Sequence, residues 1–320
     1  MLSPKIITGL KLQDDLQRII SEALDVDAAV FKQLVEEATE LICRENGRVG
    51  AFEVYGRLVS FSQLGEALVI GDLHGDLESL AVIFERSNFI QRMQQNSNSV
   101  AVFLGDYGDR GQFSAEVYYV ILKLKMLFPR QIVLLRGNHE GPEDLTAYPH
   151  DLPFQFRNRF GRLWRETYEK IRTLFEYLYN AVIIKDRLLM LHGGLSLQTK
   201  TLEDLAFAHK KHPNKPILED LLWSDPSETI DETCPSPRGA GVLFGRKITE
   251  KILHGFGVKL LIRGHEPCQW GFKINHDGRI LTLFSRKGPP YFNEYGAYLL
   301  MNFSVEFQNA EQLASYIYTF

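Results

Sequence analysis

Residues 100–111 read VAVFLGDYGDRG, an unbroken apolar run that ends in glycine and passes at once into two aspartates and an arginine. Four more apolar runs end in glycine and are followed, or interrupted near their ends, by Asp, Asn or His: ALVIG at 67–71, IVLLRG at 132–137, LLMLHGG at 188–194 and KLLIRG at 259–264. Such Val, Ile and Leu runs are typical of buried strands in an α/β sheet, and ligands collect outside the carboxyl ends of those strands. We therefore expect the polar residues that end the five runs to converge on one edge of a sheet.

Amphipathic helices are predicted around these strands. Apolar side chains recur at helical spacing over residues 10–24 and 28–45. A third helical pattern over 113–128 predicts a crossover helix between the second and third strands. Residues from 46 to about 66 are turn-rich and less periodic, so no element is assigned to them.

The composition describes an ordinary globular chain. Its 320 residues are 45% hydrophobic and 24% charged, which excludes disordered, collagen-like and disulfide-scaffold classes. With 36 Lys+Arg against 40 Asp+Glu the net charge is −4, so no general basic field is available for nucleic acid. We see no interdomain linker and predict a single domain over 1–320. It divides into an N-terminal helical segment (1–66), a core (67–303) and a C-terminal tail (304–320).

The cysteines and the N-terminus indicate the compartment. Cys43, Cys234 and Cys268 are far apart, odd in number and in no CxxC arrangement, which fits a reducing environment. Lys5 and Lys11 interrupt the N-terminus before an apolar signal region forms, and no charge-free apolar run reaches the ~20 residues that span a bilayer. We predict a cytoplasmic protein with no membrane partner.

The strand-end motifs carry oxygen and nitrogen donors but no thiolate. They are Gly71-Asp72-Leu73-His74-Gly75-Asp76, GDYGDRG at 105–111, Arg136-Gly137-Asn138-His139-Glu140, His192-Gly193-Gly194 and Arg263-Gly264-His265-Glu266. This mixed set suits Mn, Fe or Zn better than calcium, contradicts a structural cysteine zinc site and is large enough for two ions. Alone, each motif is weak, because a lone His after a strand is more often a core residue. Together and in order, they favour a metal site.

The series GDLHGD, GDYGDRG and RGNHE, followed by HGG and RGHE, closely resembles the motifs of the PPP family of serine/threonine phosphoprotein phosphatases, within the metallophosphoesterase superfamily. The resemblance runs from about residue 67 to about 300 and includes LWSDP at 222–226 and SPRGAG at 236–241. It implies an α/β fold in which two mixed β-sheets pack as a central sandwich flanked by helices. A dinuclear metal site would lie at the carboxyl ends of the strands.

The resemblance also implies a set of metal ligands and a reaction. One divalent ion would be held by Asp72, His74 and Asp106, and the other by Asp106, Asn138, His192 and His265, so that Asp106 bridges the two. The ions would be Mn²⁺ in vitro and Fe or Zn in cells. The reaction would be hydrolysis of phosphoserine and phosphothreonine in proteins by direct attack of a metal-bridging hydroxide. Independently, no cysteine is followed by Arg six residues later, which excludes the Cys-x5-Arg phosphocysteine route.

Further residues match the family's substrate and acid groups. Arg110 and Arg238 stand where the family has phosphate-clamping arginines, and Asn138 would also contact the substrate. His139 is the candidate acid that protonates the departing serine oxygen, and Asp109 would orient it. Ordinary surface arginines and a purely structural Asp–His pair are the alternative interpretations.

One more carboxylate and two segments outside these motifs complete the comparison. Asp225, in the WSDP motif, would be a partner for an arginine. Where many eukaryotic members have Ser-Ala-Pro-Asn-Tyr-Cys-Gly, this chain reads LFSRKGPPY at 283–291, so no role is assigned to Tyr291. The segment Arg286 to Tyr295 is expected to form a loop beside the catalytic cleft. The residues after Glu140 are more similar to archaeal-type members. Phosphoproteins are the implied substrates, and the sequence does not identify a regulatory subunit.

Three other classes of protein compete with this interpretation. A metallophosphoesterase nuclease typically ends its motif series in His-x-His, whereas His265 is followed here by Glu266-Pro267. A dinucleoside-polyphosphate hydrolase is closer, although GNHE and the intact DRG favour the protein phosphatase. A non-catalytic binding module would not need the complete ligand set.

Overall fold

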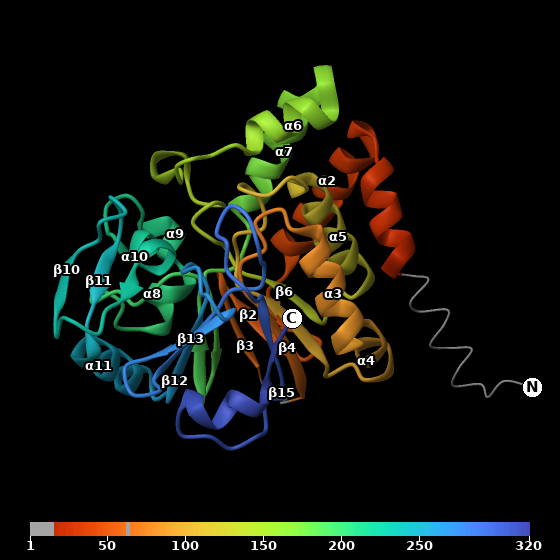
Figure 1. Ribbon diagram of the computed structural model, residues 1–320. Helices are drawn as coiled ribbons and strands as arrows, with labels where there is room; N and C mark the ends of the chain where they lie inside the picture. The colour runs from red at the N-terminus through yellow and green to blue at the C-terminus, as the bar shows by residue number, and fades with distance from the viewer. Residues whose placement is uncertain (1–15, 62–64) are drawn as a thin grey trace, which may run out of the picture.

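Two mixed β-sheets form the centre of the protein in the computed structural model, which describes residues 16–61 and 65–320 (Figure 1). The first is five-stranded, in the order β16 (Ile317–Thr319), β15 (Ala297–Asn302), β4 (Glu66–Ile70), β5 (Val100–Phe103) and β6 (Ile132–Leu134). Its strands β4, β5 and β6 are parallel, whereas β15 is antiparallel to both β4 and β16. The carboxyl ends of the three parallel strands therefore meet at one edge.

The second sheet is eight-stranded. Its order is β1 (Gly47–Val49), β2 (Phe52–Tyr55), β3 (Leu58–Phe61), β7 (Ala181–Ile184), β8 (Leu188–Met190), β12 (Leu260–Arg263), β14 (Ile280–Leu283) and β13 (Phe272–Asn275). Strands β8, β12 and β14 are parallel neighbours. A small third sheet contains β10 (Thr233–Pro235), β11 (Val242–Phe244) and β9 (Asp225–Pro226).

The inner strands β7, β8, β12 and β14 of the eight-stranded sheet are buried on both faces, and alternate side chains enter different cores. Met190 and Ile262 belong to the large hydrophobic cluster that also contains the strands of the five-stranded sheet. Their neighbours Leu189 and Leu261 belong to a second cluster with the helices on the other face. Because successive side chains of a strand point to opposite faces, this alternation is what a sandwich of two sheets requires. The expected α/β sandwich flanked by helices is confirmed.

Helices cover the outer faces of both sheets (Figure 1). On one side lie α2 (Ala28–Arg44), α3 (Leu77–Ser87), α4 (Phe89–Gln95) and α5 (Ser114–Leu127), and on the other α8 (Leu202–Ala206), α9 (Ala208–Lys211), α10 (Ile217–Trp223) and α11 (Arg246–Phe256). Helices α6 (Leu152–Phe160) and α7 (Trp164–Phe175) pack together, and α7 also contacts α2. Short 3₁₀ turns are η1 (Glu143–Leu145), η2 (Gly161–Leu163) and η3 (Ala310–Tyr316). Over the described residues, no helix combines the length and apolarity needed to cross a membrane.

The five predicted strands all form, as β4, β5, β6, β8 and β12, and the predicted helices at 28–45 and 113–128 form as α2 and α5. In the predicted helix at 10–24, residues 16–24 are helical and 10–15 lie outside the described residues. The expectation of one sheet edge is wrong, because β4, β5 and β6 belong to one sheet and β8 and β12 to the other. The two edges meet where Asp72, just after β4, forms a parallel bridge with Phe284, just after β14.

The stretch before residue 66, to which no element was assigned, contains β1, β2 and β3. These strands are only three or four residues long, too short for a clear period, and glycines stand between them. In β2, Phe52 and Val54 are nonetheless buried while Glu53 and Tyr55 are exposed. At the other end of the chain, η3 and β16 occupy part of the predicted tail. The division into one domain with three segments stays a prediction.

A buried ion pair attaches α2 to the core. Lys125 of α5 is fully buried, and its Nζ donates to Glu45 Oε1 at 2.7 Å and to the carbonyl oxygens of Pro129 and Ile132 at 2.9 and 3.0 Å. Glu45 caps the end of α2 and also accepts a hydrogen bond from the Tyr179 hydroxyl. Burial lowers the pKa of Lys125, against the charge of Glu45, which raises it. The pair matters because either charge would be costly without the other.

We predict that Lys125→Met lowers the free energy of unfolding by about 3–5 kcal/mol, since it leaves the Glu45 carboxylate buried without its cation. Urea denaturation followed by circular dichroism measures this loss. Arg44→Met is the matched control, because the Arg44–Glu40 pair is exposed on α2 and such pairs contribute about 0–1 kcal/mol. A loss in Lys125→Met no larger than in Arg44→Met would contradict the anchoring role.

Candidate metal and catalytic site

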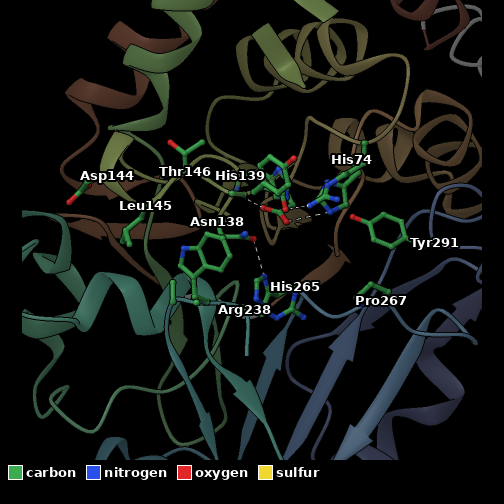
Figure 2. A pocket seen from close by; sticks show the side chains of 17 residues that line it. His74, Asn138, His139, Asp144, Leu145, Thr146, Arg238, His265, Pro267 and Tyr291 are labelled. Atoms are coloured by element: carbon green, nitrogen blue, oxygen red, sulfur yellow. Dashed lines mark hydrogen bonds and ion pairs between the residues drawn. The ribbon is translucent and has the colours of Figure 1, made fainter. Parts of the chain in front are cut away.

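The loops that follow β4, β5, β6, β8 and β12 meet at a cleft of about 560 Å³ (Figure 2). Seven of the ten predicted site residues line it: His74, Asp106, Arg110, Asn138, His139, Arg238 and His265. The other three, Asp72, Asp109 and His192, are buried and contact these residues directly. The structure therefore brings all ten predicted residues into one cluster.

The backbone of these loops is strained at the functional side chains. Five of the predicted residues have a left-handed conformation, with φ between 44° and 71°: His74, Asp106, Asp109, Arg110 and His265. Non-glycine residues rarely adopt this region, and such strain persists only where surrounding contacts impose it. Two glycines make room beside the carboxylates. A Cβ at Gly137 would lie 2.2 Å from Asp106 Oδ1, and one at Gly264 would lie 2.4 Å from Asp72 Oδ1.

A first group of donors surrounds His74. Its Nε2 lies 3.7 Å from Asp72 Oδ2 and 3.4 Å from Asp106 Oδ2. Its Nδ1 lies 3.0 Å from the Gly108 carbonyl oxygen, which fixes Nδ1 as the hydrogen-bond donor and leaves the Nε2 lone pair free. Burial lowers the pKa of His74 to about 3, so the ring is neutral. Asp72 Oδ1 accepts from the His265 backbone N–H at 2.9 Å, whereas Asp72 Oδ2 is buried with no hydrogen-bond partner.

A second group lies on the other side of Asp106. His192 Nε2 is 3.4 Å from Asp106 Oδ1 and 3.0 Å from the side-chain amide of Asn138. His265 Nδ1 is 2.9 Å from the same amide and 3.2 Å from His192 Nε2. His192 Nδ1 faces the Leu104 carbonyl oxygen at 2.9 Å, so its Nε2 points into the cluster.

The electrostatics of the cluster favour added positive charge. Burial raises the pKa of Asp72 to about 7, and the negative charge of the nearby buried carboxylate of Asp106 acts in the same direction. Burial alone would lower the pKa of His192, yet the charge of Asp106 outweighs it and raises that pKa to about 9. Carboxylates buried this closely need cations for charge balance.

These residues fit two divalent cations. Ligand atoms at about 2.0–2.2 Å from one ion lie roughly 3.0–3.6 Å apart, and the donor separations of 2.9 to 3.7 Å are close to this spacing. Asp106 turns Oδ2 toward the first group and Oδ1 toward the second. Asp72 Oδ2, buried and without a hydrogen-bond partner, is a polar atom that a cation would satisfy.

The predicted acid pair is closely formed. His139 Nδ1 lies 2.6 Å from Asp109 Oδ2, and the His139 backbone N–H donates to Asp106 Oδ1 at 3.0 Å. Burial lowers the pKa of His139, but the charges of Asp106 and Asp109 outweigh it, so the net shift is upward. The hydrogen bonds from His139 and His150 hold the pKa of Asp109 far below its usual range despite burial.

The two predicted arginines both line the cleft. Arg110 donates from Nη2 to the Tyr148 carbonyl oxygen at 3.0 Å. Arg238 donates from Nε to Asp225 Oδ2 at 2.6 Å, while Arg263 donates to the other oxygen of Asp225 at 2.8 Å. The expectation that Asp225 partners an arginine matches this geometry, with two arginines where one was expected.

The sequence interpretation quoted Glu140 within a motif but assigned it no role. Its buried carboxylate accepts hydrogen bonds from the backbone N–H groups of Asp106, Tyr107 and Gly137 at 2.8, 3.0 and 3.1 Å. It also accepts from the Tyr118 hydroxyl at 2.7 Å. Glu140 thereby fixes the loop after β5 to the loop after β6. No local signal marks this role, because the partners are mostly backbone groups distant in sequence.

The structure also places Tyr291 in the cleft, although its sequence offset suggested no role. The Tyr291 ring is 5.4 Å from the His74 ring, and the Arg286 guanidinium lies 5.4 Å above the Tyr291 ring. Arg286 Nη1 donates to the His74 carbonyl oxygen at 3.0 Å. The segment Arg286 to Tyr295 thus lies beside the cleft, as expected. Figure 2 shows Tyr291 on the side of the cleft near His74, across from Asp144 and Leu145.

Comparisons with known proteins show which family the chain resembles. The Calcineurin-like phosphoesterase family matches residues 66–269. The serine/threonine-protein phosphatase 4 catalytic subunit of Candida glabrata is 36% identical to this chain, and the match covers 68% of this chain and 67% of that protein. The serine/threonine-protein phosphatase 4 catalytic subunit of Saccharomyces cerevisiae is 31% identical, and the match covers 85% of this chain and 82% of that protein. A solved structure of a protein serine/threonine phosphatase from Saccharomyces cerevisiae, described as similar to human phosphatase PP5, superimposes with a TM-score of 0.73 at 22% identity and covers 95% of both chains.

The first prediction from this geometry concerns metal content. Asp106→Asn removes the negative charge between the two donor groups, so we expect the ions bound per chain to fall from two to one or none. Equilibrium dialysis against Mn²⁺ followed by metal analysis measures the change, and circular dichroism checks that the variant folds. The matched control is Asp231→Asn, because Asp231 is exposed and pairs with Lys247 away from the cleft. Two tightly held ions in Asp106→Asn would show that Asp106 is not shared.

Proposed function

Because the chain belongs to the serine/threonine protein phosphatases of the calcineurin-like phosphoesterase family, we propose that it hydrolyses phosphoserine and phosphothreonine in proteins at the site around Asp106. The observation that carries this proposal is the position of one buried carboxylate between two groups of metal donors. Its two oxygens point to different groups, at 3.4 Å from His74 Nε2 and from His192 Nε2. The acid pair and both arginines lie beside the same cleft.

In this proposal Asp72, His74 and Asp106 would hold one divalent ion, and Asp106, Asn138, His192 and His265 the other. When bound, such a pair of ions supplies Lewis acidity that lowers the pKa of water and neutralises charge on a phosphoryl group. The donor set of carboxylate, imidazole and amide supports Mn²⁺ in vitro and Fe or Zn in cells.

The arginines would bind the phosphate dianion. Arg110 and Arg238 both line the cleft, and their forked guanidinium groups match phosphate oxygens. Asp225 holds Arg238 through Nε, which orients the rest of that guanidinium. The amide of Asn138 lies in the same cleft and would contact the substrate as well as an ion.

His139 would protonate the departing oxygen. A serine alkoxide is strongly basic, so it leaves slowly unless a proton is delivered as the P–O bond breaks. Asp109 binds Nδ1 of His139, which leaves Nε2 as the nitrogen that can donate. The charge of Asp109 also favours the imidazolium form that an acid requires.

Substrate class and location are further parts of the proposal. Phosphoproteins are the proposed substrates, with no nucleic acid partner, since the net charge is −4. The three cysteines are free, which supports a reducing and hence cytoplasmic environment.

A substrate panel tests the reaction. In the presence of Mn²⁺ we expect the protein to release phosphate from phosphoserine and phosphothreonine peptides faster than it cleaves diadenosine tetraphosphate or single-stranded DNA. Chelation with EDTA should abolish the activity, and added Mn²⁺ should restore it. Preferential cleavage of the dinucleotide or of DNA would contradict the protein phosphatase assignment.

The leaving group tests the acid. His139→Asn should lower kcat on a phosphoserine peptide by about 10²–10⁴-fold, and lower it less on p-nitrophenyl phosphate, whose oxygen leaves readily as an anion. Asp109→Asn should shift the same ratio more weakly, because the ring remains. Metal content, measured in parallel, serves as the control. Equal losses on both substrates with two ions bound would mean that His139 is not the acid.

A further inference from the structure

Asp109 contacts two histidines, and only His139 has a role in the function proposed above. His150 Nδ1 lies 2.7 Å from Asp109 Oδ2, the same oxygen that His139 Nδ1 approaches at 2.6 Å. The other Asp109 oxygen accepts from the Leu152 backbone N–H at 2.6 Å. Three donors therefore hold a carboxylate that is itself fully buried. One comes from His139, and the other two come from the short segment 150–152.

The hydrogen-bond partners determine the proton positions on His150. An ionised carboxylate only accepts hydrogen bonds, so Nδ1 of His150 must carry a hydrogen. Its Nε2 lies 2.7 Å from the hydroxyl of Tyr168 on α7, and a neutral ring requires that hydroxyl to donate. The order of groups is then Tyr168, His150, Asp109 and His139, from the outer helix to the cleft.

The same short segment also holds the residue next to Asp109. Arg110 donates from its backbone N–H to Asp151 Oδ1 at 2.9 Å and from Nη2 to the Tyr148 carbonyl oxygen at 3.0 Å. Residues 148–152 thus contact both Asp109 and Arg110, which are consecutive residues with φ of 64° and 69°. A turn with two strained residues needs such outside contacts to persist.

We propose that His150 is a positioning residue for phosphate-ester hydrolysis: through Asp109 it holds the His139 imidazole against the departing oxygen. This inference rests on the proposed function. Without His150, Oδ1 of Asp109 is still held by the Leu152 N–H, but Oδ2 is left with no donor other than the His139 ring that it has to orient. The imidazole of His139 then loses its fixed direction, whereas the metal donors, none of which contacts His150, keep theirs.

Two substitutions separate this role from simple packing. His150→Phe keeps a ring of similar size between Asp109 and Tyr168 but has no donor. His150→Asn is smaller, yet its amide nitrogen is bonded to Cγ as Nδ1 is in histidine, so it can still donate to Asp109. If packing alone mattered, Phe would be the better replacement. The proposed role predicts the reverse.

We expect His150→Phe to lower kcat on a phosphoserine peptide about 10-fold, the lower end of the usual effect of losing a supporting partner. KM for the peptide and kcat on p-nitrophenyl phosphate should stay within about twofold, because that leaving group needs little acid assistance. His150→Asn should recover most of the loss. An unchanged kcat, an equal loss on both substrates, or no recovery in His150→Asn would overturn the proposal. If His150→Phe does not fold, His150→Gln replaces it, since its amide lies one methylene too far out.

A double-mutant cycle tests whether His150 acts through Asp109. In the Asp109→Ala background, which has no side-chain oxygen to accept from either histidine, adding His150→Phe should cause no further loss on the phosphopeptide. Losses that multiply would overturn the proposal. The activity of the wild-type protein separates a failure of this proposal from a failure of the proposed function. If the wild type does not hydrolyse phosphoserine peptides with Mn²⁺, the proposed function is wrong. If the wild type is active and the two losses multiply, only the role of His150 is wrong.

Discussion

The structure depends on keeping the charge of Asp106 buried at the junction of two sheets. A carboxylate in such a place is costly unless cations or donors surround it. The backbone N–H of His139 donates to this carboxylate, and His74 and His192 approach its two oxygens from different sides. Three features serve this requirement: the residues in the left-handed conformation, the glycines beside the carboxylates, and the hydrogen bonds by which Glu140 joins the loop after β5 to the loop after β6. They shape the loops so that each oxygen of Asp106 faces a different group of donors.

The sandwich gives these donors their relative positions. Each sheet presents the carboxyl ends of parallel strands, β4 to β6 in one and β8, β12 and β14 in the other. The strands are buried on both faces, so their ends are rigid anchors for loops that would otherwise move. The divergent segments 141–151 and 286–295 are added at the rim. They contact the core site through His150 and Tyr291 without supplying metal donors of their own.

Much of this could be predicted from the sequence, because the strand runs and the motifs are local. Continuous apolar runs that end in Gly-Asp or Gly-Asn-His identify both a buried strand and the polar loop after it. The pairing of strands is not local, so the strand runs by themselves predicted a single sheet edge, and only the family resemblance indicated two sheets; the short strands β1 to β3 were missed. Glu140, His150 and Tyr291 were missed for the same reason. Their roles arise from contacts with residues far away in the chain.

The central claim is that Asp106 is shared between two metal ions, and anomalous diffraction from crystals grown with Mn²⁺ tests it most directly. We expect two anomalous peaks about 3.5–4 Å apart, the usual separation in two-metal sites. One peak should lie against His74 and the other against His192, with one Asp106 oxygen directed to each. A single peak, or two peaks that Asp106 does not bridge, would contradict the account.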